Sequence, residues 1–276
     1  MAEPQLPRNH PRYALPHLAD LGRDLTRLTT FQRWWTVALP FVCVLAFGLF
    51  AGMSWWVPDV LAAGAYTFYS FGSTSHDLVH GNLGLPRWLN HALLALIELL
   101  GLRSGHAYRA AHLHHHRRFP HPDDIEGAGA HRSWLGALLL GPLLQIRIWW
   151  WALRHARRDR AWIVLEGIGC VAFVGAALLG WSMTPIPLIY VALVVMGSWT
   201  FPLITSYLPH NPEGADELDR TRRFRGRVAA VVFRQHLYHL EHHLYPAVPH
   251  HHWATLAERL DPCLDRAGVK PVYFGF

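Results

Sequence analysis

Cysteine is scarce in this chain. Its 276 residues include only Cys43, Cys170 and Cys263. Two of them lie inside long apolar segments, the third stands alone, and no Cys-x-x-Cys pair occurs. A disulfide framework and a cysteine-based zinc site are therefore both excluded.

Charged residues are missing from long stretches of the sequence. Residues 34–57 and 185–208 contain 24 uncharged residues each. A helix of that length extends about 36 Å, which exceeds the roughly 30 Å of a bilayer's hydrocarbon core. Residues 60–75 are also uncharged, and 161–181 contain only Glu166. The sequence predicts an all-α integral membrane protein with four transmembrane helices in two hairpins, which pair 34–57 with 60–80 and 161–181 with 185–208.

Lysine and arginine are absent from both hairpin turns. All 25 lie before residue 34, in 81–160, or from Arg220 onward. The positive-inside rule places these regions on the cytoplasmic side. The net charge of +6 is then interfacial, and a nucleic-acid partner is not expected. We predict an N-terminal cytoplasmic arm over 1–33 and a single membrane domain over 34–276.

Two further apolar stretches differ from the predicted spans. Residues 88–102 number only about 15, which is too few to cross a bilayer. Residues 134–153 contain Gln145 and Arg147, with three consecutive tryptophans near their end. We expect both stretches to form interfacial helices, with tryptophan at the level of the lipid headgroups.

Histidine is the residue that this chain has in abundance, and nine of its histidines form a pattern. Three groups lie within one helical turn each, so each group occupies one face of a helix. A single histidine follows the last apolar run. The nine are His76 and His80; His112, His115 and His116; His210; and His239, His242 and His243. On the same helix, His114 should point away from its neighbours.

Imidazole clusters of this size predict a metal site rather than structural histidines. The His-Glu-x-x-His motif of zinc hydrolases is absent, and no Glu-x-x-His pair of a soluble di-iron bundle occurs. A site of eight or nine imidazoles suits two iron ions used with O₂. Copper fits less well but stays open as an alternative.

Four motifs resemble those of the integral-membrane, fatty acid desaturase-like di-iron superfamily. They are His-Asp-Leu-Val-His-Gly from His76, His-Leu-His-His-His from His112, Tyr-Leu-Pro-His-Asn-Pro from Tyr207, and His-Leu-Glu-His-His from His239. Within that superfamily the sequence is most similar to the cyanobacterial-type β-carotene hydroxylases and to the β-carotene ketolases, and the Tyr207 motif carries this likeness.

The resemblance implies a membrane-bound oxygenase with two iron ions, for which the nine histidines are the ligands. It implies O₂ as co-substrate, a hydrophobic lipid substrate, and a bacterial plasma membrane with the histidines facing the cytoplasm. No flavin or nicotinamide fingerprint occurs, so we expect a separate, ferredoxin-type electron donor. A carotenoid ring hydroxylase or ketolase is the first hypothesis and a fatty acid desaturase the second. A membrane metal transporter is the non-enzymatic alternative.

Two buried carboxylates and one basic run complete the expectations. Glu98 and Glu166 lie in apolar stretches, where a carboxylate must be paired or face the protein interior. Five arginines precede the last histidine group, and they could bind anionic lipid or an acidic electron donor. They are Arg220, Arg222, Arg223, Arg225 and Arg227.

Overall fold

The protein folds into two compact parts, seen here in a computed structural model that describes residues 9–10, 13–226, 228 and 236–273. Residues 33–208 form the first part, which we call the long-helix unit. Residues 1–32 and 209–276 belong to the second, the terminal unit. The predicted division into an arm over 1–33 and one domain over 34–276 stays a prediction, and residues 1–8 and 11–12 of that arm lie outside the described residues.

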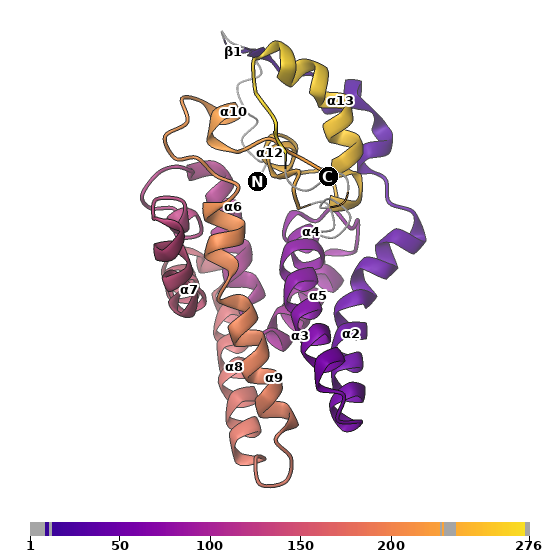
Figure 1. The fold of residues 1–276 in the computed structure, drawn as a ribbon, viewed down its shortest axis with the longest axis vertical. Helices are drawn as coiled ribbons and strands as arrows, with labels where there is room; N and C mark the ends of the chain where they lie inside the picture. Colours follow the sequence, from indigo (N-terminus) through magenta and orange to yellow (C-terminus); the bar gives the residue numbers. More distant parts are fainter. Residues whose placement is uncertain (1–8, 11–12, 227, 229–235, 274–276) are drawn as a thin grey trace. The chain divides into compact units, whose positions relative to one another are not determined.

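The long-helix unit is built from helices alone within its described residues (Figure 1). Its longer helices are α2 (Thr30–Gly52), α3 (Trp56–Tyr69), α5 (Arg87–Leu100), α6 (Gly105–Arg118), α7 (Trp134–His155), α8 (Arg160–Leu179) and α9 (Ile186–Ser198). Short segments join or extend them: η2 (Ser70–Ser75), α4 (His76–His80), η3 (Gly127–Gly129), η4 (Arg157–Asp159) and η5 (Pro202–Tyr207).

Four helical segments of the described chain are long and apolar enough to cross a membrane, as many as the sequence predicts. They are Arg23–Gly52, Trp134–His155, Arg157–Leu179 and Ile186–Tyr207. Three of them overlap predicted spans. The fourth is α7, for which the sequence predicts an interfacial position; its 22 residues extend about 33 Å, which is long enough to cross a bilayer.

The predicted span over 60–80 is helical but is not among these four segments. It comprises α3, η2 and α4, and its second half contains serine, threonine, histidine and Asp77, which lower its hydropathy. The stretch 88–102 behaves as expected, because α5 has only 14 residues.

The core of the long-helix unit lies between the two hairpins. Phe47 of α2 and Tyr66 of α3 pack with Tyr190 of α9, and the Phe47 and Tyr190 rings meet edge to face 4.9 Å apart. The Tyr190 hydroxyl donates a hydrogen bond to the Leu100 carbonyl oxygen over 3.0 Å. A buried tyrosine that finds such an acceptor contributes apolar area without leaving an unsatisfied polar group.

Two π-helical turns stand directly before histidine-bearing segments. η2 leads straight into His76, and η5 ends three residues before His210. Such turns are rare and occur often at functional sites, because the extra residue rotates the side chains that follow.

Two helix glycines provide a stability test. A Cβ atom on Gly141 of α7 would overlap the carbonyl oxygen of Trp199, so backbone would have to move, whereas one on Gly48 of α2 would meet nothing within 4 Å. We expect Gly141→Ala to cost about 1–3 kcal/mol of stability. Gly48→Ala should be neutral or stabilising by about 0.5–1 kcal/mol, because alanine favours the helix. Thermal unfolding of both variants in detergent measures the difference, and equal midpoints would contradict the close helix contact.

Within its described residues, the terminal unit combines short elements with one longer helix. Its elements are β1 (Asn9–His10), β2 (Tyr13–Ala14), α1 (Leu18–Leu21), η1 (Arg23–Thr26), α10 (Glu217–Arg220), β3 (Phe224–Arg225), α12 (His239–Leu244), η6 (His250–His252), α13 (Trp253–Arg266) and β4 (Val272–Tyr273). Its core gathers Leu25, Leu240 and Leu256 around the buried Trp253, whose indole N–H donates to the Val248 carbonyl oxygen over 2.8 Å. α13 buries one apolar face in this core and thereby supports α12.

Candidate metal centre

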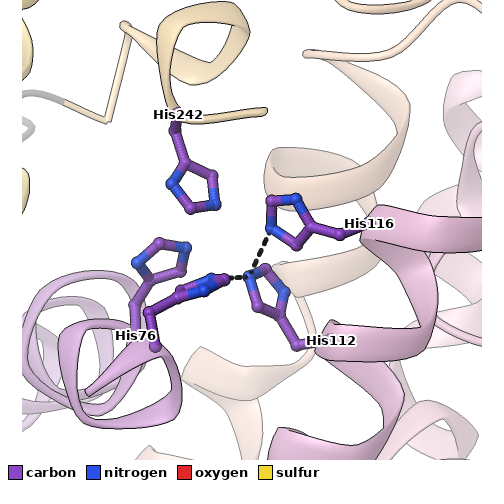
Figure 2. Close-up of side chains that lie close together, drawn as sticks. His76, His112, His116 and His242 are labelled. Carbon is purple, nitrogen blue, oxygen red and sulfur yellow. Dashed lines mark hydrogen bonds between the residues drawn. The ribbon is translucent and has the colours of Figure 1, made fainter. Parts of the chain in front are cut away.

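Four predicted ligands converge inside the long-helix unit. His76 and His80 lie one turn apart on α4, and His112 and His116 lie one turn apart on α6. One ring nitrogen from each of the four lies within 4.8 Å of those of the others. The rings of His76, His112 and His116 point toward one another (Figure 2).

His112 is at the centre of this group. Its Nε2 atom lies 3.1 Å from the Nε2 of His80 and 3.1 Å from the Nε2 of His116. Burial and the neighbouring imidazoles, His112 first among them, hold the pKa of His116 well below its ordinary value. A neutral imidazole offers a lone pair, which is the form that binds a metal ion.

The turn after α6 supplies two carboxylates that orient its histidines. The Nδ1 atom of His112 lies 3.0 Å from Oε1 of Glu126, and that of His115 lies 2.6 Å from Oδ2 of Asp124. All four side chains are buried. An imidazole whose Nδ1–H donates to a carboxylate keeps its Nε2 lone pair for a metal, and such partners are common around bound metals.

Asp124 is itself held firmly. Its second oxygen accepts a hydrogen bond from the Gly127 backbone N–H over 3.0 Å. Burial opposes the charged form of His115, but the charge and the hydrogen bond of Asp124 outweigh it, so the pKa of His115 is raised. The sequence analysis identified neither Asp124 nor Glu126 as a partner of these histidines; the acidic cluster a few residues after the histidine helix was the available clue.

The terminal unit contains a second group of three imidazoles. His239 and His243 lie one turn apart on α12. His210 is fixed beside them by an antiparallel bridge to Thr221, and the Arg222 guanidinium donates to its carbonyl oxygen. The Nε2–Nε2 distances are 3.2 Å for His210–His243, 3.3 Å for His239–His210 and 3.1 Å for His243–His239.

Hydrogen bonds between the three Nε2 atoms cannot form along all three edges of this triangle at once. Each Nε2 carries either a hydrogen or a lone pair, so at least two of the three share a state and cannot bond to each other. A shared cation satisfies all three lone pairs together. The point equidistant from the nitrogens lies about 1.9 Å from each, and zinc–imidazole bonds measure roughly 2.0–2.1 Å. The donor set therefore fits a metal ion, which these three imidazoles would hold.

The remaining histidines occupy distinct environments. His242, the ninth predicted ligand, lies on α12 with its ring 5.0 Å from that of Trp253. His114 of α6 faces Trp151 and lies 3.6 Å from Asp123, outside both imidazole groups, as its helical position predicted.

Both carboxylates of the apolar stretches are paired, as expected. Glu98 accepts from the Arg103 guanidinium over 2.6 Å, and the two side chains are buried. Glu166 lies 2.7 Å from the Nδ1 atom of His106.

The basic run is largely engaged within the terminal unit. Arg223 pairs with Asp265 over 2.6 Å and with Asp261 over 2.7 Å, and Arg225 pairs with Glu241 over 2.6 Å. These two arginines therefore connect β3 to α12 and α13. Their guanidinium groups are already paired with carboxylates of the same unit, so they contribute little to binding a partner. Arg227 lies outside the described residues.

This ion-pair network predicts a pH-dependent stability. Burial opposes ionisation of Asp261, but hydrogen bonds from Arg225 and Arg223 outweigh it and lower the pKa of Asp261. Because the folded-state pKa lies below the unfolded value of about 3.9, the stabilisation is complete above that value and is lost as the pH falls. We expect Asp261→Asn to lower the melting temperature by a constant amount between pH 7 and about pH 5, and by progressively less as the pH falls below about 3.9. A difference that stays constant with pH would contradict this assignment.

Comparison with known proteins identifies the family. The family model described as fatty acid desaturase matches residues 54–274, a range that contains all nine predicted ligands. No curated protein matches the chain significantly. This family comprises oxidoreductases, and its match together with the two imidazole groups indicates an iron-dependent enzyme that works on lipid in a membrane. The chain belongs to the fatty acid desaturase family.

Proposed function

We propose that the nine histidines bind two iron ions and that the protein oxidises a hydrophobic lipid with O₂. The grouping supports two ions, because each unit contributes at least three imidazole nitrogens within bonding reach of one centre. Iron bound by nitrogen ligands supplies O₂ activation and attack on an unactivated C–H bond.

A carotenoid ring is the substrate that we propose, with hydroxylation or ketolation as the reaction. One observation carries this choice. The Tyr207-to-Pro212 motif, which resembles the carotenoid hydroxylases and ketolases, contributes His210, and His210 lies 3.2–3.3 Å from His243 and His239. The distinguishing motif therefore contributes to an imidazole group rather than to a remote loop.

The reaction sets requirements that the side chains can meet. Hydroxylation consumes one O₂, two electrons and two protons, and it yields an alcohol and one water. Ketolation repeats the step at the same carbon. Glu126 and Asp124 accept hydrogen bonds from the Nδ1 atoms of His112 and His115, so each Nε2 atom offers a lone pair. Burial of both imidazoles keeps water from competing for these lone pairs. The electrons are proposed to come from a ferredoxin-type protein, since the chain carries no flavin or nicotinamide fingerprint.

We further propose that the histidines face the cytoplasm of a bacterial plasma membrane. The distribution of arginine and lysine supports this orientation, because both hairpin turns lack them. Reporter fusions placed in the turn between α2 and α3, at residues 53–55, and at the C-terminus should report opposite sides of the membrane.

Co-expression with a β-carotene pathway tests the substrate. Host cells that make β-carotene and lack xanthophylls should accumulate new polar carotenoids with the intact protein and none with His112→Ala. Unsaturated acyl chains together with unchanged carotene would instead establish the fatty acid desaturase. Neither product, in cells that supply reduced ferredoxin, would refute a carotenoid substrate.

A further inference from the structure

Glu166 is a carboxylate in the apolar helix α8, and the two imidazole groups do not include it. Its side chain is 4 % exposed. Oε2 accepts from the Ser104 hydroxyl over 2.6 Å and from the His106 backbone N–H over 3.2 Å, and Oε1 faces the Nδ1 atom of His106 at 2.7 Å. All three donors belong to the start of α6.

The direction of these hydrogen bonds follows from the carboxylate. An ionised carboxylate only accepts, so the Nδ1–H of His106 donates to it. The Nε2 of His106 then carries a lone pair and accepts from the Nδ1–H of His91, 2.7 Å away. Trp162, one turn before Glu166 on α8, stacks on the His106 ring with the planes 8° apart and the centroids 4.8 Å apart.

The start of a helix needs such a partner, because its first backbone N–H groups have no acceptor within the helix. A carboxylate at that end also interacts favourably with the helix dipole. Ser104 caps α6 by accepting from the Ala107 N–H over 3.1 Å, and Glu166 in turn binds the Ser104 hydroxyl. α8 therefore holds the first turn of α6 in place through the hydrogen bonds of Glu166 and the stacked ring of Trp162.

We propose that Glu166 is a positioning residue that sets the rotation and depth of α6 and so aims His112 and His116. This inference rests on the proposed function, since it takes these two as ligands. They lie six and ten residues beyond His106 on one helix of 14 residues. A slip of α6 by one residue would turn each imidazole by about 100°, away from the rings of α4.

The Glu166→Gln variant distinguishes a positioning role of this side chain from a role of its negative charge. In Glu166→Gln the amide oxygen can still accept from Ser104 and from the His106 backbone. The amide N–H₂ can donate to His106 Nδ1, provided that both His106 and His91 exchange tautomers. The geometry of the network survives and only the charge is lost, whereas Glu166→Leu removes every one of these hydrogen bonds.

Binding of Co²⁺ to the purified, metal-depleted full-length protein tests the proposal, with affinity and the visible absorption spectrum as readouts. We expect Glu166→Leu to bind Co²⁺ about tenfold more weakly with a shifted spectrum, comparable to the lower end of effects outside the ligand shell. Glu166→Gln should stay within about threefold of the parent with its spectrum unchanged. Leu165→Ala, at the adjacent and 63 % exposed position of α8, is the matched control and should match the parent.

Each outcome decides a separate point. Parent-like affinity and spectrum in Glu166→Leu would overturn the positioning role, and a glutamine variant as defective as the leucine one would assign the effect to charge. Absence of Co²⁺ binding by the parent would refute the proposed metal site itself. If Glu166→Leu does not fold, Trp162→Ala takes its place. Its Co²⁺ spectrum should shift as in Glu166→Leu, and Trp162→Phe, which keeps a stacked ring, should restore the parent spectrum.

Discussion

Replacing His112 with alanine is expected to abolish product formation and to remove at least one iron ion per chain. The Nε2 of His112 lies 3.1 Å from those of both His80 and His116. Its loss also leaves the buried carboxylate of Glu126 without its imidazole. Metal analysis of the purified variant and chromatography of lipid extracts measure the two effects. We expect the same losses for His115→Ala and His242→Ala.

His114→Ala is the control on the same helix. This side chain lies two residues from His112 and His116, contacts Trp151 and Asp123, and is outside both imidazole groups. Its removal should leave iron content and turnover close to those of the parent. Full activity in His112→Ala, or complete loss of iron in His114→Ala, would show that α6 presents a different face to the metal.

Removing the carboxylate partners should weaken metal binding without removing a ligand. Asp124→Ala and Glu126→Ala are each expected to lower metal affinity by about 10–100-fold, the range typical of groups that orient metal-bound histidines. The imidazole would then lose the acceptor that fixes its tautomer and its ring plane. Competition with a chelator, followed for each variant at one pH, gives the affinity directly.

The neighbouring Asp123 offers a matched control for these two variants. Its carboxylate is 44 % exposed, pairs with Arg118 and His121, and orients neither His112 nor His115. Asp123→Ala should therefore bind metal as the parent does. A comparable loss in Asp123→Ala would assign the effect to the charge of the turn, and unchanged affinity in Asp124→Ala would remove that residue from the metal centre.

The sequence predicts which histidines share a helical face, because the spacing of residues along one helix determines the direction in which each side chain points. His76 with His80, His112 with His116, and His239 with His243 each meet one turn apart, as the 3.6-residue period requires. Which carboxylate reaches which imidazole could not be predicted in this way. Glu126 meets His112 only because the chain turns back after α6, and no local pattern fixes that path.

The membrane segments show where hydropathy alone gives an incomplete answer. The absence of charge located three of the four candidate spans. Segment 60–80 was assigned as a span because residues 60–75 carry no charge, although serine, threonine and histidine make its second half polar. Segment 134–153 was assigned to the interface because of Gln145 and Arg147, although α7, which runs from Trp134 to His155, is also long and apolar enough to cross. Length and side-chain polarity have to be weighed together, and a charged residue inside a span needs a partner that only the tertiary structure supplies.

Iron content per chain tests the central claim most directly. The purified full-length protein, shown active on its lipid substrate, should contain two iron ions per chain, and this number should fall in His112→Ala and in His243→Ala. An active preparation without iron would contradict the assignment of these imidazoles as an iron centre.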